Sequence, residues 1–85
     1  MTGTLRLQPS GSWAIAWPGR EPVRIRAGES FKLEVDGQMR RTRMEYRDAR
    51  WQEQGYYSAD GYRLADGLRA GFFDQRERYA RSITA

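Results

Sequence analysis

Short runs of alternating apolar and polar residues, each ended by turn-forming residues, determine what this chain can fold into. Alternation with a period of two places neighbouring side chains on opposite faces of a β-strand. Such runs recur along most of the 85 residues, and signals such as Pro18-Gly19 and Asp36-Gly37 end them. The expected strands lie at residues 5–7, 13–17, 23–26, 31–35, 38–46, 51–57 and 68–70.

Six or seven short strands in so short a chain predict a mostly β protein with one domain. A two-sheet sandwich of ordinary size needs more residues, so we expect a single small bent antiparallel sheet or an SH3-like or OB-like barrel. We assign this β domain to residues 1–73. Residues 74–77 have the spacing of a helix-capping box, so residues 74–85 are expected to form a short helix or a frayed tail.

The Asp36-Gly37 turn sets the register of the central hairpin, because this dipeptide favours a two-residue type I′ turn. Because side chains alternate between the two faces along each strand, Met44 and Tyr46 lie on the same face as Phe31. The expected pairs are Val35–Gln38, Leu33–Arg40 and Phe31–Thr42.

Two further hairpins follow from the other turn signals. A three-residue loop at residues 28–30 would pair the strand at residues 23–26 with the next one, setting Ile25 against Leu33 and Arg24 against Glu34. The Asp60-Gly61 dipeptide would set Tyr57 against Leu64 in the same way.

The other face of this three-stranded sheet is strongly basic. It carries six cationic and two acidic side chains, and Arg50 and Trp51 at its edge could stack on an exposed base. Such a face suits contact with nucleic-acid phosphates. The alternative is a solvated surface with cross-strand ion pairs that protects against aggregation. The six cations are Arg24, Arg26, Lys32, Arg41, Arg43 and Arg47.

The basic residues are almost all arginine, since Lys32 is the single lysine among the 15. Arginine presents a planar fork of donors that suits phosphate and carboxylate. A GC-rich coding sequence would produce the same bias, so composition does not decide between the two interpretations. The net charge of +4 argues against an acidic mimic of DNA.

The absence of cysteine and histidine excludes several kinds of chemistry. Disulfides, thiolate or histidine metal sites and the Ser–His and Cys–His nucleophile pairs cannot be built. The eleven acids are scattered singly, and no glycine run resembles a phosphate-binding loop. We therefore expect a protein that is not an enzyme and has no cofactor and no metal. No signal peptide or membrane-spanning stretch is evident, so we expect a cytoplasmic location without membrane contact.

The aromatic residues divide into core candidates and candidates for an interface. Trp13, Trp17, Phe31 and Tyr46 alternate with small or aliphatic residues, which is typical of a core. Tyrosine and phenylalanine that remain near the surface are favoured at protein interfaces. The residues of this alternative protein interface are Tyr56, Tyr62, Phe73 and Tyr79.

Four segments carry a resemblance to a known group of proteins: residues 27–31, 35–37, 42–46 and 64–70. Over residues 3–70 the chain resembles an uncharacterised family of short bacterial proteins, a domain of unknown function found on plasmids, integrated elements and prophages. The resemblance implies a small accessory protein of a mobile element and supplies no catalytic residues. Such proteins regulate transfer or transcription, or disable host defence.

Two functions follow as expectations. The first is a non-catalytic binding module that contacts nucleic acid or a nucleoprotein complex through the arginine-rich face. The second is a protein-interaction module, either an anti-CRISPR-type inhibitor of host defence or a homodimeric accessory protein.

Overall fold

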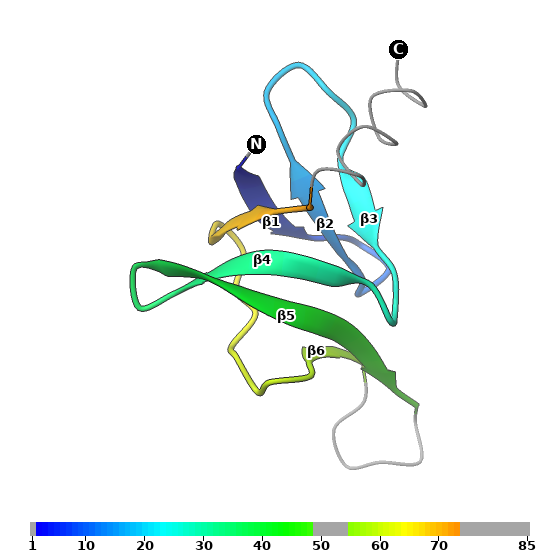
Figure 1. Ribbon diagram of the computed structural model, residues 1–85. Helices are drawn as coiled ribbons and strands as arrows, with labels where there is room; N and C mark the ends of the chain where they lie inside the picture. Colours follow the sequence, from blue (N-terminus) through cyan, green and yellow to red (C-terminus); the bar gives the residue numbers. More distant parts are fainter. Residues whose placement is uncertain (1, 49–54, 74–85) are drawn as a thin grey trace.

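A computed structural model describes residues 2–48 and 55–73, and this part of the chain consists of strands and turns. The expected helix at residues 74–85 lies outside the described residues. No described segment forms a helix long and apolar enough to cross a membrane. The mostly β prediction is confirmed (Figure 1). The strands are β1 (Gly3–Leu7), β2 (Trp13–Ala16), β3 (Val23–Ile25), β4 (Ser30–Val35), β5 (Gln38–Arg47), β6 (Gly55–Ser58) and β7 (Arg69–Gly71).

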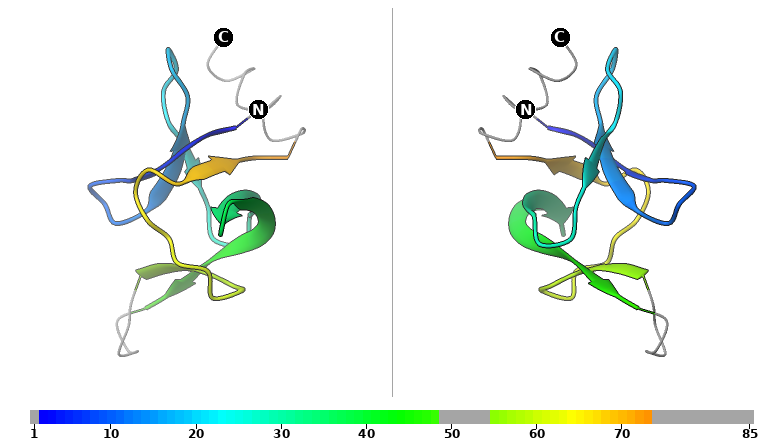
Figure 2. Two further views of the ribbon diagram at one scale, coloured as in Figure 1. Left: turned by 90° about the vertical axis from the view of Figure 1, so that its left-hand side faces the viewer. Right: turned by 90° about the vertical axis from the view of Figure 1, so that its right-hand side faces the viewer.

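All seven strands belong to one antiparallel sheet in the order β3-β2-β1-β7-β4-β5-β6. The sheet curls into a half-barrel, with strongly bent β4 and β5 on one side and β1 to β3 on the other (Figure 2). The short strand β7 lies between β1 and β4 and joins the two halves. Leu5 exchanges backbone hydrogen bonds with the segment before β7, donating to Leu68 O at 2.7 Å and accepting from Gly67 N at 2.8 Å.

The central hairpin β4–β5 has the expected register. Val35 pairs with Gln38, Leu33 with Arg40, and Phe31 with Thr42. Asp36 and Gly37 both have positive φ, at 52° and 79°, as a type I′ turn requires. Arg40 shares the face of Leu33 but is exposed, because it lies beside the hairpin tip.

The expected hairpin between β3 and β4 is wrong. The edge strand β3 pairs with β2, so that Ile25 lies opposite Trp13 and Arg24 opposite Ala14. Residues 26–29 form a tight turn, in which the Glu29 carboxylate accepts from Arg26 N at 2.6 Å. The same loop then bonds to β5 through Gly28 N and Met44 O. The chain therefore crosses from one half of the sheet to the other instead of folding back, and Arg24 does not oppose Glu34.

The expected pairing of Tyr57 with Leu64 is also wrong. The strand β6 pairs only with β5 among the described residues, and Tyr57 lies opposite Glu45. A turn does form at Asp60-Gly61, closed by a hydrogen bond from Gly61 N to Ser58 O. The chain after it runs toward β7, where Leu64 packs against the core. The ten-residue strand β5 extends beyond β4, and this extension provides the ladder for β6.

The core lies inside the curl and contains residues from both halves of the sheet. Trp13, Trp17 and Phe31 are buried, as expected. The ring of Trp17 packs 6.0 Å from that of Phe72. Tyr46 was expected in the core but is 53 % exposed, because the end of β5 passes beyond the buried cluster. The fully buried apolar side chains are Leu5, Ile15, Ile25, Phe31, Leu33, Met44, Ala70 and Phe72.

A contact between side chains connects the two edge strands of the sheet. Arg24 on β3 donates from Nη2 to the Tyr56 hydroxyl on β6 at 2.5 Å, and its guanidinium lies 5.8 Å from the ring centroid. Tyr46 packs on the same ring, with 4.9 Å between centroids. The curled sheet is thus closed by a polar contact where no backbone ladder joins its edges.

Substitution Tyr56→Phe tests this closure. It removes the acceptor of Arg24 and keeps the ring, so we expect the free energy of unfolding to fall by about 0.5–1.5 kcal/mol, the usual contribution of one hydrogen bond. Denaturant unfolding followed by circular dichroism measures the change. Tyr57→Phe on the other face of β6 is the matched control, and an equal loss in both variants would contradict a specific role for the Arg24 contact.

A second prediction concerns Asp66, whose carboxylate accepts from Leu7 N at 2.9 Å and from Arg6 Nη1 at 3.0 Å. The hydrogen bond from Leu7 N, followed by Arg6, lowers the pKa of Asp66 below its ordinary value of 3.8. The ionised carboxylate of Asp66 therefore stabilises the fold fully above pH 3.8, the ordinary pKa, and this stabilisation is lost as the pH falls through the lowered pKa.

We expect Asp66→Asn to be less stable than the wild type at neutral pH, with a difference that shrinks as the pH falls below 3.8. Thermal unfolding of both proteins across the acid range measures it. Asp36→Asn is the control, since it removes one charge at a turn where Asn is equally favoured. A difference that stayed constant down to the lowest pH would show that the charge of Asp66 is not responsible.

Candidate nucleic-acid interface

The strands β4, β5, β6 and β7 present one continuous surface away from the core. On β4 this surface includes Lys32, which pairs with Arg41 on one side and with Gly71 on the other. Phe73 follows Gly71 by two residues and so reaches the same face. We call this surface the basic outer face. Its members are Lys32, Glu34, Met39, Arg41, Arg43, Glu45, Arg47, Tyr57, Arg69 and Phe73.

The basic outer face holds the whole charge excess of the described chain. Residues 2–48 and 55–73 contain eleven basic and eight acidic side chains, a net charge of +3. Five of these bases and two of these acids lie on the basic outer face, which therefore also has a net charge of +3. The other six bases and six acids cancel. The net positive charge of the described residues is therefore the net charge of this face.

At one end of the face, two cations share the ring of Phe73. The Arg41 Cζ lies 4.7 Å from the ring centroid and the Lys32 Nζ lies 5.6 Å from it. Both distances are within the range of cation–π attraction. Neither cation forms an ion pair with a carboxylate of the described residues. A cation held by a ring keeps its N–H donors for another acceptor, so this end can bind an anion without first breaking an ion pair.

The other end of the face also has a cation over an aromatic ring. Arg47 lies over the ring of Tyr57, with 4.4 Å between Cζ and the centroid. Between the two ends, Arg43 forms an ion pair with Glu45, and these side chains remain 56 % and 31 % exposed. The face is therefore a basic surface flanked by two aromatic rings, each in contact with arginine.

The structure brings together four of the residues expected to bind nucleic acid and places Arg24 and Arg26 elsewhere. Lys32, Arg41, Arg43 and Arg47 share the basic outer face, because they belong to the hairpin whose register was predicted. Arg24 and Arg26 were expected there too, but the pairing of β3 with β2 removes them from it. Arg24 contacts Tyr56 at the sheet edge, and Arg26 is exposed at the turn after β3. Arg50 and Trp51 lie outside the described residues.

Sequence reasoning did not assign Arg69, Tyr57 or Phe73 to this surface. Tyr57 joins it through the pairing of β6 with β5. Arg69 and Phe73 join it because β7 docks beside β4, a strand more than thirty residues earlier in the chain. Alternation within residues 68–73 places Arg69 and Phe73 on one face, but nothing local identifies β4 as the partner.

The residues of the alternative protein interface have different surroundings. Tyr56 and Tyr62 are partly buried and pack against the core. Phe73 lies on the basic outer face, across the sheet from the core. Tyr79 lies outside the described residues.

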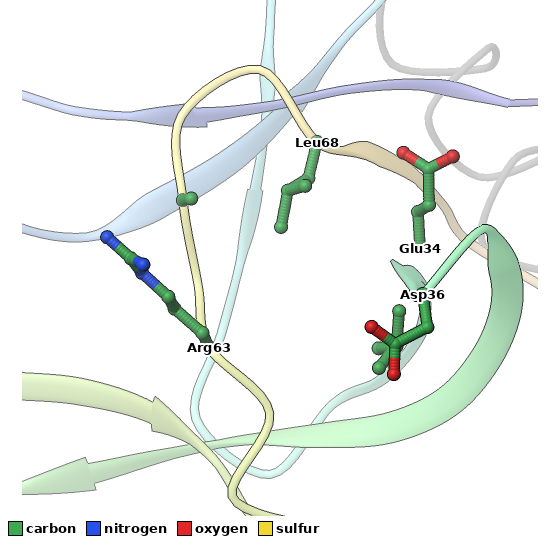
Figure 3. A pocket seen from close by; sticks show the side chains of 6 residues that line it. Glu34, Asp36, Arg63 and Leu68 are labelled. Carbon is green, nitrogen blue, oxygen red and sulfur yellow. The ribbon is translucent and has the colours of Figure 1, made fainter.

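The pocket nearest to the hairpin tip is open and has mixed chemistry. It has a volume of about 290 Å³ and lies between the end of β4 and the segment that leads to β7 (Figure 3). Acidic side chains lie on one side and Arg63 on the other, with apolar groups between them. Its lining residues are Glu34, Val35, Asp36, Arg63, Ala65 and Leu68. Within residues 2–48 and 55–73, no cluster of three or more acidic side chains could hold a metal ion.

Comparison with known proteins adds no further candidate residues. No family model, no curated protein and no solved structure matches this chain.

Proposed function

We propose that this protein is a non-catalytic module that binds nucleic acid through the basic outer face. The observation that carries the proposal is the segregation of charge, since the face has a net charge of +3 and the remaining described residues are neutral. A polyanion gains from contact with such a face by releasing condensed counterions. Surfaces that serve only solubility normally intersperse both signs of charge.

The contacts that the cationic side chains make within the protein support phosphate as the group that they bind. Lys32 and Arg41 are directly opposite each other and share Phe73 instead of a carboxylate. The guanidinium of Arg41 can therefore offer its N–H groups to phosphate oxygens in the geometry that suits them. Arg43 can exchange Glu45 for phosphate with little loss, because exposed ion pairs contribute little stability.

The resemblance to short proteins of mobile elements supports a biological setting for this binding. The nucleic acid would then be one that the element transfers or transcribes, or part of a nucleoprotein complex of host defence. Both settings use the same surface, because either one presents phosphates to it.

Charge reversal tests the proposal. We expect Lys32→Glu with Arg41→Glu to weaken binding of a labelled DNA oligonucleotide roughly ten-fold or more, and to reduce the slope of log affinity against log salt by about one per lost phosphate contact. Fluorescence anisotropy from low to physiological salt measures both quantities. Circular dichroism of the double variant verifies that it is folded.

The matched control is Arg20→Glu with Arg63→Glu, which changes the net charge by the same amount outside the basic outer face. We expect this control to retain most of the affinity. Equal losses in the two double variants would show that total charge, and not this face, governs binding. If the wild-type protein bound neither DNA nor RNA even at low salt, the proposal would be overturned and a protein partner would become the next candidate.

A further inference from the structure

We infer that the basic outer face takes single-stranded nucleic acid in preference to duplex, with Phe73 and Tyr57 as stacking platforms for two bases. This inference rests on the proposed function and specifies its ligand. It follows from what lies at the two ends of the face, where each aromatic ring is in contact with a cation.

The rings are placed where packing of the core does not require them. Phe72 is fully buried against Trp17 and anchors the end of β7, whereas Phe73 points to the opposite side of the sheet. Tyr57 likewise faces away from Tyr56, which packs against the core. Both outer rings are partly exposed. The rings are contacted by surface cations and not by core residues, so a base could stack on a ring or on its guanidinium without disturbing the interior.

The two platforms lie on different strands of the sheet. Phe73 lies just after β7 and Tyr57 belongs to β6, and β4 and β5 lie between these strands. Three strand spacings separate β7 from β6, which is about 14 Å at the usual spacing of roughly 4.8 Å and suits an extended strand of a few nucleotides. Arg43 lies between them on the same face. An extended nucleic-acid strand that crosses β4 and β5 from Phe73 to Tyr57 would meet a ring, cations and a second ring in turn.

Single-stranded and duplex nucleic acid differ in whether their bases are available for stacking on the protein. In a duplex the bases are stacked on one another, so a phenyl ring on the protein surface finds no free base and meets only the phosphate backbone. In a single strand the bases are available, and stacking on an aromatic ring is favourable for every base because each has a π-face. A neighbouring guanidinium extends the platform, since bases also stack on arginine. Basic residues alone would serve either form, and the rings favour the single strand.

The experiment compares one labelled deoxyoligonucleotide of mixed sequence with the duplex that it forms with its complement. Wild-type protein and the variants Phe73→Leu and Tyr57→Leu are titrated against both at low salt, with fluorescence anisotropy as the readout. Leucine keeps an apolar side chain of similar volume and removes the π-face. We expect each substitution to weaken single-strand binding roughly five-fold or more and to change duplex binding less than about two-fold.

Two further variants keep the result interpretable. Tyr46→Leu removes a ring that is 53 % exposed but does not belong to the basic outer face, so single-strand affinity should be retained. Phe73→Trp keeps a π-face at the same position, and binding equal to or tighter than that of the wild type supports the inference even if Phe73→Leu fails to fold.

The possible outcomes test the preference for single strands separately from the proposed binding of nucleic acid. Binding of both forms with equal affinity, unaffected by the leucine substitutions, would overturn the single-strand inference and leave the basic outer face as a general phosphate contact. Equal losses on both forms would also overturn it, since the rings would then act only by positioning the cations. Absence of binding to either form by the wild-type protein would overturn the proposed function itself.

Discussion

The docking of β7 between β1 and β4 is the constraint on which the rest of the structure depends. Three residues bridge two sets of strands that otherwise share no backbone ladder in the sheet order. Ala70 and Phe72 fill the core from this position and are fully buried. The pairing joins positions more than sixty residues apart, so the entropy of closing a long loop must be offset by burial on both sides. The same docking places Phe73 beside Lys32 and Arg41.

Much of the fold could be predicted from the sequence where the information is local. The Asp36-Gly37 turn predicts the register of β4 and β5, because a two-residue turn fixes every pair of its hairpin. The partners of β3 and β6 could not be predicted in this way. A turn signal indicates that the chain reverses but does not identify the strand that it joins, and residues 26–29 show this by leading β3 across the molecule. Close packing adds a requirement of the same nonlocal kind. A Cβ atom at Gly3 would lie 2.5 Å from Ala16 O, so β1 can approach β2 only with glycine there.

The candidate site follows the same division between local and nonlocal information. Lys32, Arg41, Arg43 and Arg47 were assigned to one face because hairpin parity alone determines their placement. Arg24 was misplaced because its strand pairs elsewhere, and its contact with Tyr56 at the sheet edge gives it a structural role.

The pairing of Lys32 with Arg41 favours a binding role over a purely solvated surface. Like charges directly opposite each other on adjacent strands destabilise the pair by roughly 0.2–1 kcal/mol, whereas a carboxylate at either position would stabilise the hairpin. The ring of Phe73 offsets this cost, since an exposed cation–π contact contributes about 0.5–1 kcal/mol. The arrangement thus holds two cations side by side without neutralising either one. Under the proposed function the absence of a carboxylate between these two strand positions has a use, because a carboxylate at that point would repel the phosphates that the face is proposed to bind.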